Sequence, residues 1–151
     1  MPASSTTAPG NVLASSSSIL AQGMLLTDQQ PPFGQPYAPT STPVNGTILV
    51  PTNNLPTITL YLKLAAEYYN PNTQAYIYPA LETWFTPLVQ IGGVQTVSGA
   101  LPLAAPILLP VERAVFYTVR GNYSNVGFNI RTDGNGGQNL AFIEYVISGS
   151  Q

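Results

Sequence analysis

Side chains that could carry out acid–base catalysis are few in this chain and widely separated. Histidine and cysteine are both missing, which leaves six acidic and four basic residues. A glycosidase-type reaction needs two carboxyl groups about 5–10 Å apart beside a cleft, and nothing in the spacing of the acids indicates that any two converge. Isolated charges that discourage aggregation at sheet edges explain them more simply. The acids considered are Glu67, Glu82, Glu112, Asp133 and Glu144. We therefore predict no catalytic residues and no enzymatic activity, with a small glycoside hydrolase as the third alternative among the functions.

The residue types that bind metals and cofactors are also lacking. Without cysteine or histidine the chain cannot form a disulfide, a Cys- or His-ligated zinc site, or a Ser-His or Cys-His nucleophile. Residues 133–137 (DGNGG) partly match a calcium-binding loop, but Gly137 stands where that loop needs an oxygen ligand, and the distal glutamate is absent. Neither a G-x-G-x-x-G turn nor a Walker lysine is present. We predict no metal and no cofactor.

The charge balance argues against nucleic acid as a partner, and the prolines of the longest apolar stretch argue against a membrane span. The net charge is −2, whereas nucleic-acid-binding proteins present clusters of basic residues. The longest apolar stretch, residues 92–110, contains three prolines, which would interrupt a membrane-spanning helix. We expect strands and turns there. Residues 1–10 lack the basic and apolar regions of a signal peptide.

The chain divides near residue 47 into two parts of different composition. Residues 1–47 contain one charged residue, Asp28, and Ser, Thr, Pro and Gly supply 24 of them. Such a segment resists packing into a core and favours extended conformations, yet it carries apolar clusters that a solvated linker does not need. We predict an extended N-terminal arm that lies along a neighbouring surface; a loose tail or a domain-swapped strand is the alternative. The arm residues expected to be buried there are Leu25, Leu26, Phe33 and Tyr37.

Residues 48–151 show the two-residue alternation of β-strands. In residues 57–64 (TITLYLKL) the isoleucine and the three leucines fall on one face, as in a half-buried strand. Pro87 lacks an amide donor, which predicts an edge strand or two short strands over residues 81–91. Further strands are expected at residues 76–78, 94–97, 114–120, 126–131 and 139–147, the last of them central, and residues 64–69 could form one helical turn. The predicted fold is all-β: a β-sandwich or jelly-roll-like domain of seven or eight short strands.

One turn signal is stronger than the rest. Residues 132–138 (TDGNGGQ) hold Asp-Gly and Asn-Gly pairs, which favour the positive φ angles of tight hairpins. Centring a hairpin on Asn135 would place Phe128 opposite Phe142 and Ile130 opposite Leu140. We predict that the two flanking strands pair directly.

Aromatic residues are dense in residues 68–85. Adjacent residues of a strand point to opposite faces, so one member of Tyr68-Tyr69 and one of Trp84-Phe85 should lie outside the core. Tyrosine and tryptophan are enriched at protein interfaces and can stack on sugars. We predict that Tyr68, Tyr69, Trp84 and Phe85 contribute to an interface of the β-domain.

The scarcity of charge is the property with the widest consequence. Charged residues make up 7% of the chain, against roughly 25% in typical proteins, and residues 83–111 contain none. A lone monomer would present broad neutral surface and tend to associate. The sequence therefore favours a protein whose surface is covered by sister subunits or by a larger assembly.

An uncharged Pro/Ser/Thr-rich arm followed by a compact β-domain, without Cys, His or catalytic motifs, resembles the head decoration (cement) proteins of tailed bacteriophages. The resemblance implies a jelly-roll-type domain, commonly trimeric, that binds over joints between major capsid subunits with a terminus reaching across a neighbour. It implies a location on the capsid surface of the virion after synthesis in the host cytoplasm. Removing residues 1–47 should then weaken shell binding while the β-domain stays folded. The alternative is a carbohydrate- or receptor-binding β-module of the fibre or baseplate type that stacks ligands on Trp84 and the tyrosines.

Overall fold

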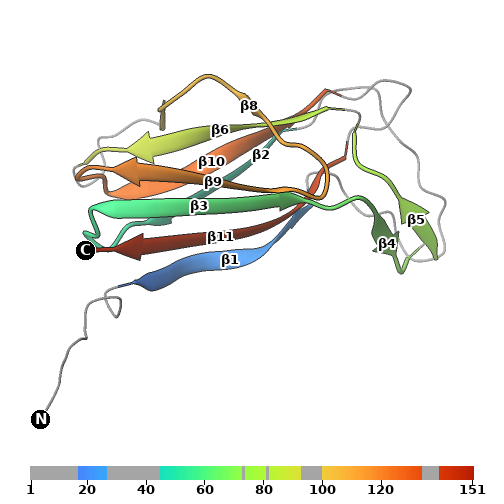
Figure 1. The fold of residues 1–151 in the computed structure, drawn as a ribbon, viewed down its shortest axis with the longest axis horizontal. Coiled ribbons are helices and arrows are strands. Elements are labelled where there is room, and N and C mark those ends of the chain that lie inside the picture. The colour runs from blue at the N-terminus through green and yellow to red at the C-terminus, as the bar shows by residue number, and fades with distance from the viewer. Residues whose placement is uncertain (1–16, 27–44, 73, 81, 93–99, 134–139) are drawn as a thin grey trace, which may run out of the picture.

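The chain folds as an all-β sandwich, as the sequence predicted (Figure 1). The computed structural model describes residues 17–26, 45–72, 74–80, 82–92, 100–133 and 140–151, and these contain no helix. One sheet has the strand order β1 (Ser18–Leu26), β11 (Phe142–Ser150), β3 (Thr57–Leu64) and β9 (Ala114–Arg120). The other has the order β2 (Asn45–Pro51), β10 (Asn125–Thr132), β6 (Thr83–Gln90) and β7 (Leu101–Pro102), with β8 (Ile107–Leu108) also paired to β6. A small hairpin of β4 (Tyr68–Asn70) and β5 (Ala75–Ile77) projects from one end.

The strand order is that of one long antiparallel ribbon wound into two layers. β1 pairs with β11, β2 with β10, β3 with β9, and β6 with β7 and β8. The first strands of the chain thus pair with the last ones, and the strands nearer the middle of the chain pair with one another. The chain passes from one sheet to the other at each step from β1 to β2 to β3, and again from β8 to β9 to β10 to β11. Loops therefore collect at the two ends of the sandwich (Figure 1).

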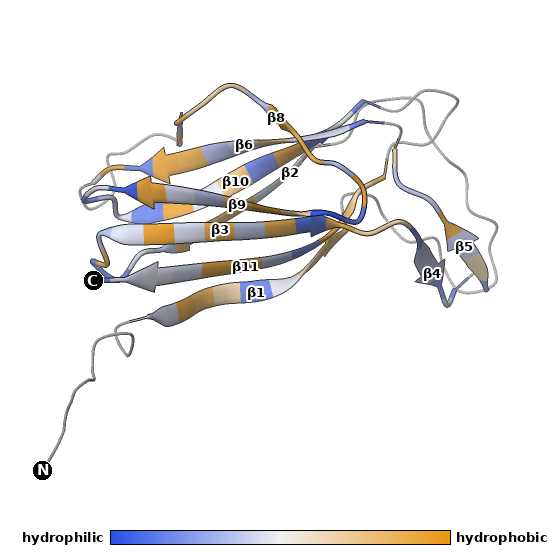
Figure 2. Cartoon of the chain, in the orientation of Figure 1, coloured by the Kyte–Doolittle hydropathy of each residue, from blue (hydrophilic) through white to orange (hydrophobic). Residues whose placement is uncertain are grey.

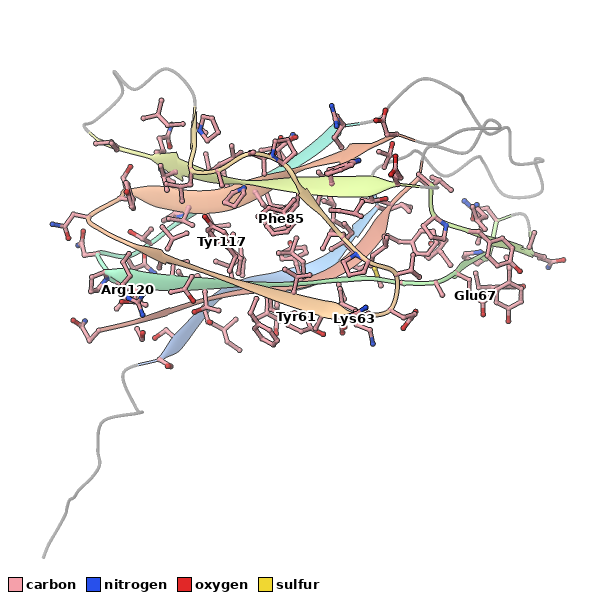
Figure 3. All side chains as sticks on the ribbon, turned by 45° about the horizontal axis from the view of Figure 1, so that its top comes forward. Tyr61, Lys63, Glu67, Phe85, Tyr117 and Arg120 are labelled. Atoms are coloured by element: carbon pink, nitrogen blue, oxygen red, sulfur yellow. The ribbon has the colours of Figure 1, made fainter. Side chains whose placement is uncertain are left out.

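The core lies between the sheets and is built from alternating residues, visible as alternating bands of hydropathy along the strands (Figure 2). In β3 every second side chain is fully buried and the intervening ones are not, which confirms the half-buried strand predicted there. β6 and β10 contribute facing residues in the same way. Figure 3 shows Phe85 and Tyr117 between the sheets, and their rings meet edge-to-face at a centroid distance of 6.3 Å.

Pro87 does not place β6 at an edge, contrary to the prediction. β6 pairs along its length with β10 on one side, and with β8 and β7 at its two ends on the other. The Pro87 carbonyl accepts a hydrogen bond from the Leu103 amide on the β7 side. Because the N and O of one strand residue point to the same side, the missing amide donor faces the gap between β8 and β7, and the ladder to β10 stays intact.

The prediction that the two strands flanking Asn135 pair directly is wrong. β10 pairs with β2 and β6, whereas β11 pairs with β1 and β3, so the connection crosses between sheets. Phe128 lies opposite Ile48 and Pro87 instead of Phe142. The turn residues 134–139 and the strand predicted at 94–97 lie outside the described residues. The helical turn suggested at residues 64–69 is also absent. β3 ends at Leu64, β4 begins at Tyr68, and the residues between them are not helical.

Part of the predicted arm belongs to the sandwich. β1 pairs with β11 over its length, apart from an irregularity between Ile19 and Ala21. Leu25 packs against the main core, and Leu26 against a second cluster made by Ile77, Leu140 and Phe142. These two leucines, expected to be buried against a neighbouring subunit, are half-buried by the chain itself, because the free edge of β11 offers hydrogen bonds and apolar surface together. Phe33 and Tyr37 lie outside the described residues.

Candidate functional site

The four-stranded sheet carries the largest exposed apolar side chains of its strands on the side away from the core. Side chains on this side form two rows across the strands, one of Gln22, Val146, Tyr61 and Phe116, the other of Ile19, Ser148, Thr59 and Thr118. Phe116 is 68% exposed and Ile19 61% exposed. None of the residues in these two rows carries a charge. We call the surface formed by these two rows and Met24 the outer face.

Within the outer face the aromatic pair is held in a fixed arrangement. The rings of Tyr61 and Phe116 meet edge-to-face with centroids 5.3 Å apart, and the Tyr61 hydroxyl lies 3.4 Å from Glu144 Oε1. Tyr61 and Lys63 project from β3 on the side away from the core (Figure 3). A partner would therefore meet a preformed aromatic surface and would lose little side-chain entropy in ordering it.

Charges lie at the two ends of the outer face. At one end Lys63 stands opposite Glu144 in the ladder, and its Nζ lies 3.5 Å from Glu112 Oε1. Glu112 Oε2 also accepts the Ala66 amide at 2.6 Å. At the other end Arg120 lies opposite Thr57. The carboxylates of Glu112 and Glu144 flank one hollow together with Met24, Lys63 and Ala65, but Glu112 uses both of its oxygens to hold the segment before β9 against β3.

The aromatic residues singled out in the sequence separate into buried and exposed members. Phe85 is a fully buried core residue, and Tyr68 packs on Phe142 with ring centroids 5.5 Å apart. The prediction that Phe85 contributes to an interface is wrong, because the pleat turns its side chain into the core. Tyr68 is half-buried, and its role in an interface stays a prediction. Tyr69 is 48% exposed and pairs with Tyr76 at the end hairpin. Trp84 is half-buried, and its Nε1 is enclosed without a hydrogen-bond partner among the described residues.

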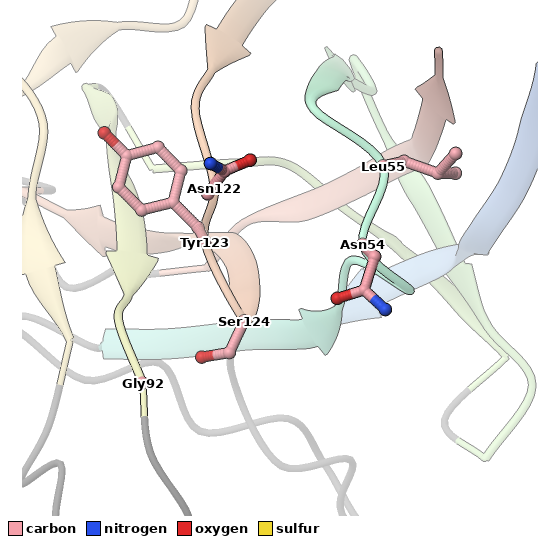
Figure 4. Close-up of a pocket in the computed structure, with 6 residues that line it drawn as sticks. All are labelled: Asn54, Leu55, Gly92, Asn122, Tyr123 and Ser124. Atoms are coloured by element: carbon pink, nitrogen blue, oxygen red, sulfur yellow. The ribbon is translucent and has the colours of Figure 1, made fainter.

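A second concave surface lies at the opposite end of the sandwich from the β4–β5 hairpin (Figures 1 and 4). Its volume is about 250 Å³ and its lining carries no charge. The residues come from the β2–β3 turn, the β9–β10 turn and the position after β6, and are Asn54, Leu55, Gly92, Asn122, Tyr123 and Ser124. No pattern in the sequence pointed to this pocket, since its three segments are brought together only by sheet pairing.

Other kinds of site have no support among the described residues. No group of three or more acidic residues gathers in a way that could hold a metal ion within that part of the chain. The described segments also contain no helix of the length and apolarity needed to cross a membrane. Comparison of the chain with protein-family models, with curated proteins and with solved structures found no match.

Proposed function

We propose that this protein is a structural subunit of a virion, a capsid decoration protein that binds over joints between major capsid subunits and stabilises the shell. The observation that carries the proposal is the outer face. Ile19 and Met24 are exposed on the edge strand β1 and Phe116 on the opposite edge strand β9, and the residues between them in the two rows carry no charge. Large apolar side chains left exposed across one face of a sheet mark a site of association. The occupant we propose is the neutral surface of a shell subunit.

Burying the outer face against another protein carries little desolvation cost. No ion has to be desolvated along its central rows, so apolar contact is not opposed by the cost of dehydrating a charge. Four strands about 4.8 Å apart and two rows, each taking about 6.6 Å along the strands, cover roughly 250 Å². A standard interface buries about 800 Å² on each partner. The outer face would thus supply about a third of one interface, and the predicted arm residues Phe33 and Tyr37 are candidates for the remainder.

The winding of the fold supports the same proposal. The first strand pairs with the last and the second with the penultimate one, a nested pairing that jelly rolls also have, and jelly rolls recur in viral capsid proteins and in lectins. We propose on this ground that the sandwich is of the jelly-roll type that the resemblance to bacteriophage decoration proteins implies. Many identical weak contacts repeated over a shell would act together and resist internal pressure.

The test is co-sedimentation with shells assembled from the major capsid protein of the same source. Wild-type protein should pellet with the shells, and Phe116→Asp should bind at least tenfold more weakly, because it places an unpaired charge in the interface. Leu101→Asp is the matched control: Leu101 is 55% exposed but lies on the other sheet. Both variants should keep the wild-type unfolding temperature, since both positions are exposed.

Two results would contradict the proposal. One is wild-type protein that stays in the supernatant at every shell concentration; the other is Phe116→Asp that pellets as well as wild type. Sedimentation velocity of the free protein tests the accompanying expectation of a homo-oligomer, a trimer by the resemblance. A dimer broken by Phe116→Asp, without shell binding, would assign the outer face to a second copy of the chain instead.

A further inference from the structure

Hydrogen bonds join the segments that form the pocket at the loop end of the sandwich. The Thr52 amide donates to the Ser124 carbonyl at 3.0 Å, and the Ser124 amide and hydroxyl both donate to the Gln90 carbonyl at 2.9 Å. The Thr52 hydroxyl donates to the Tyr123 carbonyl. These bonds tie the β2–β3 turn, the β9–β10 turn and the end of β6 to one another. A ligand would therefore meet walls that are already in place, which lowers the entropy cost of binding.

Unusual backbone conformations set the directions of the pocket side chains. Asn53 and Asn54 both have positive φ angles, 54° and 65°, which turn the chain sharply and project the Asn54 carboxamide over the pocket (Figure 4). Gly121 has a φ of 146°, and a Cβ there would lie 2.6 Å from the Tyr123 ring. The ring thus lies directly over the Gly121 backbone, and any other residue at that position would displace it.

The lining offers hydrogen bonds without charge. The carboxamides of Asn54 and Asn122 make no hydrogen bond to other described residues, so each has two donors and one acceptor free. Tyr123 adds a hydroxyl group, and the Ser124 oxygen, whose hydrogen is already donated to the Gln90 carbonyl, adds an acceptor. Because no cation lines the pocket, a phosphate or carboxylate would lose its hydration without a counter-charge. The matching ligand is neutral and carries closely spaced groups that both donate and accept, as the hydroxyls of a sugar ring do.

Size and composition agree with that chemistry. The pocket volume of about 250 Å³ is below the roughly 300–1,000 Å³ of sites that bind drug-sized ligands, which favours a ligand no larger than a single ring. Asn, Gly, Tyr and Ser are also enriched in the binding loops of antibodies, which lie at one end of a β-sandwich. We propose that this pocket binds a single neutral hexopyranose, the terminal residue of a glycan.

The test is a titration of ¹⁵N-labelled full-length protein with neutral monosaccharides, followed by amide chemical shifts. The panel is glucose, galactose, mannose and N-acetylglucosamine, with sialic acid and glucose 6-phosphate as charged comparisons, each taken to about 100 mM, which would saturate a site with a dissociation constant near 10 mM. At least one sugar should shift the amides of residues 121–124 and 53–55. A glycan array probed with the same protein then separates free sugar from a chain-terminal residue as the preferred source.

Two variants in the pocket and one control variant outside it show whether the sugar binds at this pocket. Asn54→Gly removes a carboxamide at a position where glycine tolerates the positive φ, and Asn122→Ala removes the other; each should weaken binding about tenfold. Gln74→Gly is the matched control, because Gln74 is also exposed with a positive φ of 56° but lies at the opposite end, in the β4–β5 hairpin. It should bind as wild type does.

The proposal is overturned if no sugar shifts the loop-end amides, if both asparagine variants bind as wild type, or if a sialic acid or sugar phosphate binds more tightly than every neutral sugar. The outcome is independent of the proposed shell binding. Phe116→Asp should retain sugar binding, and Asn122→Ala should still co-sediment with shells. A failure at one surface is thereby distinguished from a failure at the other.

Discussion

Replacing Gly127 by alanine tests how closely β2 and β10 approach in this sandwich. An added Cβ at Gly127 would lie 1.8 Å from the Ile48 carbonyl oxygen and 2.8 Å from the Leu49 Cα. Cβ atoms essentially never approach other heavy atoms within 3.0 Å, so β2 would have to retreat by about 1.2 Å. The obstacle is backbone on a paired strand, which cannot turn aside as a flexible side chain can.

The expected loss in the free energy of unfolding follows from the packing and the hydrogen bonds that a retreat of β2 would disrupt. Overpacking a well-filled site costs about 1–3 kcal/mol, and each backbone hydrogen bond stretched beyond use costs about 1 kcal/mol more. With two such bonds lost, the free energy of unfolding should fall by about 3–5 kcal/mol. At about 3 °C for each kcal/mol in a chain of this size, the unfolding temperature should drop by about 10–15 °C.

Gly23→Ala is the control in the same thermal unfolding experiment, followed by circular dichroism. Gly23 also lies in a paired strand, but a Cβ there would meet the Tyr145 hydroxyl at 3.4 Å, an ordinary contact. Its unfolding temperature should stay within about 3 °C of wild type, since alanine also reduces the freedom of the unfolded chain by about 0.4–1 kcal/mol. If Gly127→Ala unfolds at the same temperature as Gly23→Ala, the backbone of β2 does not lie against Gly127, and the expected clash is refuted.

Two further predictions concern the core and the N-terminal segment. Phe128→Ala should lower the free energy of unfolding, measured in urea, by about 3–5 kcal/mol, because Phe128 is fully buried and its ring meets Tyr145 edge-to-face. Phe116→Ala, at an exposed position, is the control. Equal losses of stability for the two variants would contradict the assignment of Phe128 to the core and Phe116 to the outer face. Removing residues 1–26 should destabilise the protein and promote aggregation on heating, as followed by light scattering, because the loss of β1 exposes the edge of β11. This replaces the expectation that the first 47 residues can be removed without harm to the β-domain, and an unchanged unfolding temperature for the truncated chain would restore it.

Most strands could be predicted from the sequence because their signal is local. In residues 57–64 the apolar side chains recur at every second position, and the strand that forms has those same limits. The pattern of residues 114–120 likewise predicts the limits that β9 has. The same kind of local pattern misleads at residues 132–138: a strong turn signal suggests direct pairing of its flanking strands, but a sandwich can use a turn to carry the chain from one sheet to the other.

The surfaces proposed as functional could be predicted only in part. The aromatic content of residues 68–85 indicated exposed rings, and Tyr69 is one of them, yet Phe85 is buried and Tyr68 is half-buried. Phe116 was not singled out, because residues 114–120 alternate apolar side chains on both faces and the sequence does not say which face meets the core. The loop-end pocket gave no signal either, since Asn54, Gly92 and Asn122 are far apart along the chain.

The sequence by itself determined the class of molecule: an all-β chain, without the residues for thiol chemistry, imidazole chemistry or Cys- or His-ligated zinc, and with too few charges to cover its surface. Those properties depend on composition and on the side-chain pattern within single strands. Only the tertiary structure decided which strands pair, which aromatic side chains remain exposed on the outer face, and which turns meet around the pocket. These depend on hydrogen bonds and packing between residues distant in the sequence, and each such pairing is fixed by the competition of all strands for the same partners.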